Sequence, residues 1–200
     1  MTTLFYLVRH AAHDNVGNYL AGRTGGVHLG VEGRAQAARL GQRMAREQFD
    51  AILASPRERT QETAEAISAA SGVNPVETAS ALDEVDFGVW AGRTFAELDQ
   101  DEGWRRWNSM RSMSRSPGGE SMLDVQSRIV DLLATLAARA PAGRLVLVSH
   151  GDVIKSAVSY VLGLPIDAWP RLEIAPASIT VVVTGPWGGK VLTLNEACTG

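Results

Sequence analysis

Two histidines in this chain directly follow apolar runs that are typical of buried strands. His10 comes after Leu4–Val8 and Arg9, and His150 ends a stretch that begins at Arg144. Ligands of α/β sheets bind beyond the carboxyl ends of the strands, so the two histidines could face one site from neighbouring strands. A single histidine after a strand is more often a structural or surface residue. Two in matching positions, one beside an arginine, favour a functional site.

A second feature is the start of a helix at the end of another expected strand. Ser55 can cap the helix, Pro56 suits its first position and Glu58 completes a capping box. A helix N-terminus attracts anions, and Arg57 or Arg59 would add a guanidinium group suited to phosphate. Arginines on a solvated helix surface explain this segment equally well when it is taken alone.

A third feature is the carboxylate of Glu84, which lies in a loop with Phe87, Gly88 and Trp90. An acidic side chain beside an aromatic, glycine-bent loop can be partly shielded from water. Such shielding raises the pKa of a carboxyl group and makes it a usable proton donor. Taken alone, this segment does not exclude a simple polar turn.

The elements that must position these residues alternate between strands and helices. Strands are expected over 4–8, 51–54, 76–78, 144–149, 179–184 and 190–194, and helices over 31–48, 55–70, about 125–140 and 151–162, with irregular helices over 95–113. This order predicts an α/β fold, a three-layer α/β/α sandwich with a mostly parallel central sheet.

Composition and charge narrow the class of protein. The 200 residues are 45% hydrophobic and 20% charged, which suits one globular domain over residues 1–200. The formal net charge of −3 argues against a nucleic-acid partner, whose binding surface is usually strongly basic. Cys198 is the only cysteine, so no intrachain disulfide supports secretion, and the apolar start of the chain resembles neither a signal peptide nor a membrane span. We therefore expect a cytoplasmic protein without a membrane partner.

Six strings, in this order, resemble the histidine phosphatase superfamily, which includes the cofactor-dependent phosphoglycerate mutases. Each string alone is weak, but the six together are highly specific and cover nearly the whole chain. They are Leu7-Val8-Arg9-His10, Leu29-x-x-x-Gly33-x-x-Gln36-Ala37, Ser55-Pro56-x-x-Arg59-x-x-x-Thr63-Ala64, Glu84-x-x-Phe87-Gly88-x-Trp90-x-Gly92, Gly118-Gly119-Glu120-Ser121 and Val148-Ser149-His150-Gly151.

The resemblance implies a role for each matching residue. His10 looks like the nucleophile that becomes a phosphohistidine, and Glu84 looks like the general acid. Arg9, Arg59 and His150 look like the pocket for the phosphoryl oxygens. Elementary chemistry agrees, because a neutral imidazole can attack phosphorus, while two arginines and a histidinium can neutralise the oxygens. Neither a metal nor another cofactor is expected.

The chain departs from the family pattern just after the candidate nucleophile. Ala11 stands where glycine is usual, and His13 is among the residues that replace the common acidic and hydroxyl side chains. These changes alter the floor of the expected pocket. Asn15 and Arg23 are candidate substrate contacts, as is His13, and a place on the loop surface explains all three equally well. Arg57 does not occupy the family arginine position, so its role is open.

In this superfamily an insertion after the acidic loop tends to overhang the pocket, and residues 94–120 are expected to form such an inserted helical cap. This cap segment carries Trp104, Arg106, Trp107 and Arg111. Aromatic and arginine side chains suit a leaving group with a flat or apolar part and a second anionic group. Arg106 and Trp107 are therefore candidate substrate contacts. The alternative is a helix with buried tryptophans and solvated arginines.

These observations predict a phosphatase that hydrolyses a small phosphorylated metabolite through a phosphohistidine. A mutase of the same superfamily is the first alternative. Mutases of this type carry a longer and more basic segment after the glutamate loop, and this chain has Asp86–Trp90 there without such an extension. A non-catalytic binding module is the second. The sequence names neither the substrate nor the oligomeric state.

Overall fold

A six-stranded sheet forms the centre of the computed structural model, which describes residues 1–14 and 17–198. The strands lie in the spatial order β3-β2-β4-β1-β5-β6. The first four are mutually parallel, whereas β5 and β6 run antiparallel to their neighbours as a closing hairpin. The mostly parallel sheet is confirmed. Its strands are β1 (Thr3–Arg9), β2 (Ala51–Ala54), β3 (Val76–Thr78), β4 (Arg144–Ser149), β5 (Ile179–Gly185) and β6 (Gly188–Glu196).

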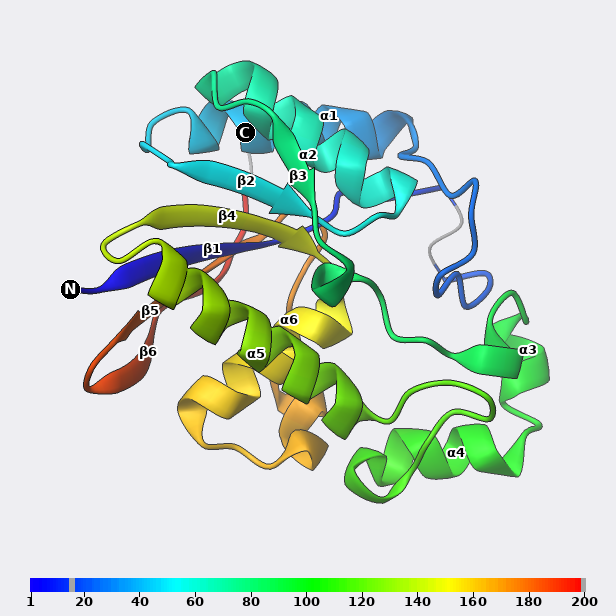
Figure 1. Ribbon diagram of the computed structural model, residues 1–200. Coiled ribbons are helices and arrows are strands. Elements are labelled where there is room, and N and C mark those ends of the chain that lie inside the picture. Colours follow the sequence, from blue (N-terminus) through cyan, green and yellow to red (C-terminus); the bar gives the residue numbers. More distant parts are fainter. Residues whose placement is uncertain (15–16, 199–200) are drawn as a thin grey trace.

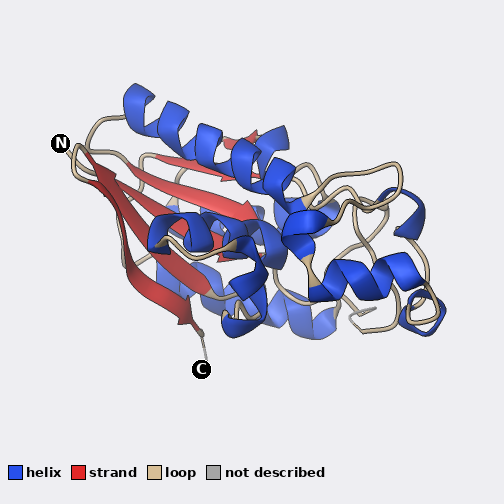
Figure 2. Ribbon diagram, turned by 90° about the horizontal axis from the view of Figure 1, so that it is seen from below, coloured by secondary structure: helices blue, strands red, loops and turns tan. Residues whose placement is uncertain are grey.

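Helices cover both faces of this sheet, as Figures 1 and 2 show. On one face α1 (Val31–Met44) packs against α2 (Glu58–Ser71), and on the other α5 (Met122–Arg139) packs against α6 (Gly151–Leu162). The three-layer α/β/α sandwich is therefore confirmed. The expected end of α1 was wrong, because the helix ends at Met44 rather than at residue 48.

The central strands are apolar on both faces because both faces are covered by helices. Successive side chains of a strand point to opposite sides. In β1, Phe5 and Leu7 accordingly join the core under α5 and α6, while Tyr6 and Val8 join the core under α1 and α2. A slip of one residue would exchange these two sets, so the packing fixes the register and with it the position of the residues after the strand.

The cap segment lies beyond the carboxyl ends of the parallel strands (Figure 1). It contains the short helices α3 (Phe95–Leu98) and α4 (Glu102–Ser109) and a 3₁₀ turn over Arg111–Met113. Thr94 caps α3 in a capping box, and Asp101 caps α4 by accepting a hydrogen bond from a backbone N–H. Two helix starts so close together explain why the segment is irregular.

The start of α2 differs from the expected one. The helix begins at Glu58, its N-cap position is Arg57 in an extended conformation, and no side chain caps it. The capping box at Ser55 was therefore wrong. The physical reason is that the Ser55 hydroxyl is engaged elsewhere: its Oγ lies 2.8 Å from His150 Nε2 and donates to Asp83 Oδ1 at 3.3 Å.

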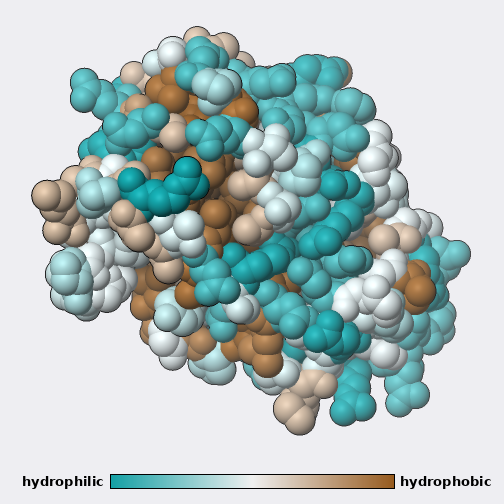
Figure 3. All heavy atoms as spheres, in the orientation of Figure 1, coloured by the Kyte–Doolittle hydropathy of each residue, from teal (hydrophilic) through white to brown (hydrophobic). Residues whose placement is uncertain are grey.

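Hydrophilic residues cover most of the face drawn in Figure 3, and apolar patches show between them, chiefly in the left half. Within residues 1–14 and 17–198, no helix combines the length and the apolar character that crossing a membrane requires.

Candidate active site

The sheet brings the two histidines together. Strands β1 and β4 are parallel neighbours with Arg9 opposite Ser149, so the residues after them emerge at the same edge. The backbone N–H of His10 donates to the carbonyl of Ser149 at 3.0 Å, and the ring centroids of His10 and His150 are 5.2 Å apart. Both side chains are buried. The expectation that adjacent strands present both histidines to one place is confirmed.

The tautomer of His10 follows from its neighbours. Its Nδ1 lies 2.8 Å from the carbonyl oxygen of Ala11, which can only accept a hydrogen bond, so Nδ1 carries the proton. Its Nε2 accepts a hydrogen bond from Arg59 Nε at 3.3 Å. Burial, followed by the charges of Arg59 and Arg9, lowers the pKa of His10 well below its usual value. The ring is therefore neutral at neutral pH, with a lone pair on Nε2.

Arg59 joins the two histidines from the first turn of α2. Its Nη2 donates to the carbonyl of Gly22 at 2.8 Å and to His150 Nδ1 at 3.2 Å, while Nε contacts His10. The side chain is almost completely buried. Its Nη1 has no hydrogen-bond partner in the described part of the chain. A buried N–H without a partner is costly, and Arg59 lines a cavity, so this atom is available to an anion that enters it.

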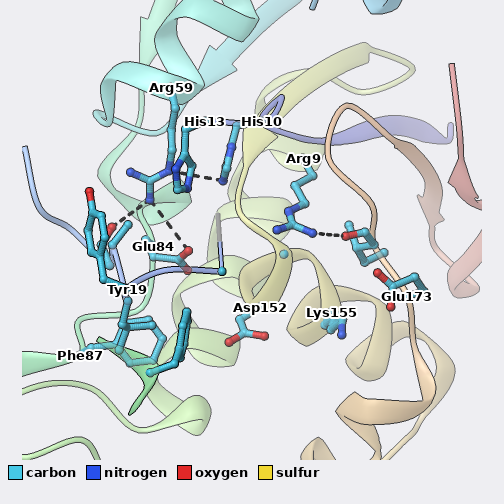
Figure 4. A pocket seen from close by; sticks show the side chains of 17 residues that line it. Arg9, His10, His13, Tyr19, Arg59, Glu84, Phe87, Asp152, Lys155 and Glu173 are labelled. Atoms are coloured by element: carbon cyan, nitrogen blue, oxygen red, sulfur yellow. Dashed lines mark hydrogen bonds and ion pairs between the residues drawn. The ribbon is translucent and has the colours of Figure 1, made fainter. Parts of the chain in front are cut away.

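Arg9 adds a second cation at the cavity (Figure 4). Its Nη1 donates to the carbonyl of Ile174 at 2.6 Å, and its Nε, like Nη1 of Arg59, lacks a partner among the described residues. The guanidinium lies against Gly151, where an added side-chain carbon would be 3.5 Å from the central carbon of that group. Arg9, His10 and Arg59 line one cavity of about 270 Å³.

The proton on His150 is also set by its partners. Because Arg59 donates to Nδ1, the proton of a neutral ring lies on Nε2 and is donated to Ser55 Oγ, which in turn donates to Asp83. Burial, and then the charge of Arg59, lowers the pKa of His150 well below its usual value. This lowered pKa favours a neutral His150 ring in the absence of a bound anion. Arg9 and Arg59 supply the positive charge of the site.

Glu84 completes the cluster. Its Oε2 lies 3.5 Å from His150 Nδ1 and 4.0 Å from Arg59 Nη2. Burial outweighs the opposing attraction of Arg59 and raises the pKa of Glu84 to about 7. This carboxyl group is close to half protonated at neutral pH, which suits a group that must both give and take a proton.

A network of ion pairs fixes the loop that carries Glu84. Arg23 donates through Nε to the carbonyl of Glu84 at 2.8 Å and through Nη2 to Glu120 at 2.9 Å. Arg57 pairs with Asp83 at 3.0 Å, next to Glu84 in the chain. Arg23 does not appear among the residues that line the cavity, so its geometry favours holding this loop over touching substrate.

Two glycines allow backbone segments to meet around the site. Gly88 has a φ of +50°, and a side-chain carbon there would lie 2.1 Å from the carbonyl oxygen of Pro117. At Gly33, the first turn of α1 approaches the loop after His10, and a side-chain carbon would lie 1.7 Å from the carbonyl oxygen of Ala12. Both glycines belong to strings quoted above, and close backbone approach is why they are glycine.

The remaining expected substrate contacts have different locations. His13 lines the cavity and stacks on His10, with ring centroids 5.9 Å apart. Asn15 lies outside the residues that the structure describes. Trp107 is completely buried and Arg106 is exposed, and neither lines the cavity. For these two, the structure has the alternative arrangement, a buried tryptophan beside a solvated arginine.

Other residues line the cavity that sequence reasoning did not select. Tyr19, Phe87 and Phe95 form an aromatic side, and Asp152 and Lys155 form a polar side. Figure 4 shows Tyr19 and Phe87 at one part of the cavity and Asp152 and Lys155 at another. A signal for the polar side was present. Asp152 and Lys155 follow His150 by two and five positions on the expected helix. Helix positions three apart share a face, so both side chains could have been expected near His150. The aromatic side required knowledge of the tertiary structure, because its members come from three separate loops and helices.

A family model for the histidine phosphatase superfamily (branch 1) matches residues 5–197 of this chain. The chain belongs to this superfamily. Among its relatives is the "Probable phosphoglycerate mutase GpmB" of Salmonella choleraesuis (strain SC-B67), 36% identical over 179 residues that cover 88% of this chain and 82% of the relative.

Solved structures agree with this assignment. A mycobacterial glucosyl-3-phosphoglycerate phosphatase superimposes with a TM-score of 0.88 at 28% identity, covering 98% of this chain and 100% of that one. Bacillus stearothermophilus YhfR gives a TM-score of 0.91 at 25% identity, covering 97% of both chains. The resemblance that the six strings carried is thus confirmed for the superfamily and for the fold.

Proposed function

We propose that this histidine phosphatase hydrolyses small phosphomonoesters through a phosphohistidine at His10. The observation that carries the proposal is the state of the His10 ring. Its Nδ1 proton is held by the carbonyl of Ala11, so Nε2 is an unprotonated nucleophile beside the buried guanidinium of Arg59. A phosphatase among the similar structures supports hydrolysis as the reaction type.

In the first step, the lone pair on His10 Nε2 forms a bond to phosphorus as the bond to the leaving oxygen breaks. The free N–H groups of Arg9 and Arg59 bind the phosphoryl oxygens, which carry the developing charge. Glu84 gives its proton to the leaving oxygen, which departs as a neutral alcohol. The hydrogen bond from Nδ1 to Ala11 stabilises the positive charge that the ring then carries.

In the second step, a water molecule attacks phosphorus and the bond to Nε2 breaks. Glu84, now a carboxylate, takes a proton from that water. Because burial raises the pKa of Glu84 to about 7, either proton transfer costs little near neutral pH. Inorganic phosphate leaves, and the neutral His10 ring and the protonated Glu84 are restored.

Phosphoryl transfer between positions of phosphoglycerate is the second candidate, because the relative at 36% identity carries the name of a mutase. The two reactions share the phosphohistidine and differ in the final acceptor, water or a second hydroxyl. Incubation with 3-phosphoglycerate, with and without 2,3-bisphosphoglycerate, separates them. A phosphatase releases inorganic phosphate under both conditions, whereas a mutase produces 2-phosphoglycerate and depends on the bisphosphate.

The direct test is turnover of p-nitrophenyl phosphate, followed by acid or base treatment of enzyme trapped during turnover. The bound phosphoryl group should be labile to acid and stable to base, and vanadate should inhibit. EDTA-treated enzyme should keep its activity, because Arg9 and Arg59 provide the charge that a metal would otherwise supply. An acid-stable phosphoserine, or activity restored only by Mg²⁺ or Zn²⁺, would contradict this mechanism.

A further inference from the structure

The polar side of the cavity is built by the first two turns of α6. His150 stands at the N-cap of this helix, and Gly151, Asp152 and Lys155 all line the cavity. Residues three and four apart lie on one face of a helix, so Lys155 is placed one turn beyond Gly151, about 5.4 Å along the axis. A cation therefore lies next to the phosphate site and is separate from it.

Lys155 forms no ion pair in the described part of the chain. Among the described residues, no carboxylate lies within 4.0 Å of its ammonium group, which is 5.1 Å from the centre of the Trp169 ring. The side chain is half-buried, and burial lowers the pKa of Lys155, an effect that the more distant Asp152 and Glu173 only partly oppose. A shielded ammonium group without a paired counterion attracts an anion from solution.

The two nearby carboxylates, Asp152 and Glu173, do not act as a paired counterion for Lys155. Asp152 pairs with Arg111 of the cap segment at 2.9 Å, and that arginine is itself buried against Trp169. Glu173 is exposed at the rim of the cavity and forms no ion pair within 4.0 Å among the described residues. Figure 4 shows Asp152, Lys155 and Glu173 on the side of the cavity away from Arg59 and His13.

We propose that Lys155 binds a second anionic group on the leaving part of the substrate, either a carboxylate or a second phosphate. This inference rests on the proposed function, because it places the phosphoryl group at His10. The spacing of about one helical turn suits a short carbon chain between the two anions. The aromatic side of Tyr19, Phe87 and Phe95 packs against the apolar part of that chain.

A ladder of three-carbon substrates tests the proposal. Glycerol 3-phosphate ends in a neutral hydroxymethyl group, 3-phosphoglycerate ends in a carboxylate, and glycerol 1,3-bisphosphate ends in a phosphate. We expect the wild-type protein to have a higher kcat/KM for at least one of the two substrates with an anionic end than for glycerol 3-phosphate. The substrate that gains more identifies the anion.

The variants are Lys155→Met, which keeps the apolar stem and removes the charge, and Lys155→Arg, which keeps the charge. Lys155 and Lys190 are the two lysines of this chain, and Lys190 is exposed on β6, so Lys190→Met is a matched control. We expect the preference ratio to fall by about 10- to 100-fold in Lys155→Met, as for loss of a hydrogen-bonded charge pair. It should be largely retained in Lys155→Arg and in Lys190→Met.

Chemical labelling gives a readout that needs no turnover. In the His10→Ala variant, acetic anhydride should acetylate both lysines, and 3-phosphoglycerate or glycerol 1,3-bisphosphate should protect Lys155 but not Lys190. Glycerol 3-phosphate should protect Lys155 much less. The extent of acetylation at each lysine is measured by mass spectrometry.

The two hypotheses fail differently. Failure of the wild-type protein to hydrolyse p-nitrophenyl phosphate overturns the proposed function, and labelling still reports whether Lys155 binds the second anion. An unchanged preference ratio in Lys155→Met, or equal protection of Lys155 by all three ligands, overturns the proposal for Lys155. In that case its ammonium group is only a solvated neighbour of Trp169.

Discussion

The cap segment and the proposed phosphoryl site, which is the cavity lined by Arg9, His10 and Arg59, are both rich in cations and aromatic rings, but they use them differently. At the proposed phosphoryl site, Arg9 and Arg59 line the cavity, and Nε of Arg9 and Nη1 of Arg59 lack hydrogen-bond partners among the described residues. In the cap segment, Arg111 is buried between Asp152 and the ring of Trp169 and holds the cap against the body of the protein. Its Nε also lacks a partner among the described residues, but Arg111 does not line the cavity. Residue type alone therefore does not distinguish a binding group from a docking group. The direction in which the backbone presents each group decides between them.

The largest effect is expected at the centre of the phosphoryl site. His10→Ala removes the only nitrogen placed to attack phosphorus in the proposed mechanism, so turnover of p-nitrophenyl phosphate should fall to background. The free energy of unfolding in urea should stay near that of the wild type. A variant that is well folded and retains substantial turnover would show that another group is the nucleophile.

Glu84→Gln should have the next largest effect, and it should depend on the leaving group. General acid catalysis contributes about 10²- to 10⁴-fold, so hydrolysis of alkyl phosphates should lose that factor. Hydrolysis of p-nitrophenyl phosphate should lose much less, because its leaving group needs little protonation. Equal losses on both substrates would assign the proton donor to another residue.

The pH dependence sharpens the same point. The acid form of Glu84 decreases as pH rises through its pKa of about 7, so kcat/KM for alkyl phosphates should decline above that pH. The pKa of His10 is lowered well below 6.5, so the neutral nucleophile persists on the acid side. The decline above pH 7 should disappear in Glu84→Gln, and its persistence there would point to a different titrating group.

Substitution of a buried residue in the cap segment should lower the stability of the protein rather than change its chemistry. Trp107 is fully buried and packs edge-on against Phe87 and Trp90. Trp107→Ala should lower the free energy of unfolding by about 3–5 kcal/mol, as for other large-to-small aromatic changes in a core. Trp107→Phe is the control, and it should cost less because Trp107 Nε1 has no hydrogen-bond partner among the described residues. A change in substrate ranking without a loss of stability would instead support Trp107 as a substrate contact.

A smaller effect on activity is expected from Ser55→Ala, because Ser55 forms a hydrogen bond with His150. Ser55→Ala removes the acceptor for His150 Nε2 and the link to Asp83, so the ring is no longer held in one tautomer. We expect kcat/KM to fall about tenfold, the equivalent of one hydrogen bond near 1.4 kcal/mol. Ser159→Ala is the matched control, a buried serine whose hydroxyl has no partner in the part of the structure described. Equal effects of the two variants would show that Ser55 contributes only by packing and not through its hydrogen bond to His150.

The smallest effect is expected for Arg106→Ala. The side chain is exposed on α4 and does not line the cavity, so the KM for phosphorylated metabolites should change by less than about twofold. Comparison with Arg111→Ala is informative, because Arg111 holds Asp152 at the cavity mouth and should alter both stability and KM. A raised KM in Arg106→Ala, without such a change in Arg111→Ala, would support Arg106 as a substrate contact, as the sequence suggested.

Prediction from sequence succeeded where a local rule fixes orientation. The continuous apolar runs before His10 and His150 require strands that are covered on both faces, and parallel strands end at one edge of the sheet. It failed at Ser55, because a serine at that position can either cap the helix or form a hydrogen bond with His150. Nothing near Ser55 in the sequence reveals that His150 lies 2.8 Å away.

The sequence by itself predicted which residues gather at the proposed phosphoryl site, because they lie in short strings at strand ends whose geometry is set by hydrogen bonds within the sheet. Only the tertiary structure decided which neighbours surround those residues. It shields Glu84 enough to raise its pKa to about 7, turns Trp107 into the core and brings Tyr19, Phe87 and Phe95 together at the cavity. These outcomes depend on packing between segments far apart in the chain, and on the loss of water that this packing causes, which no local pattern records.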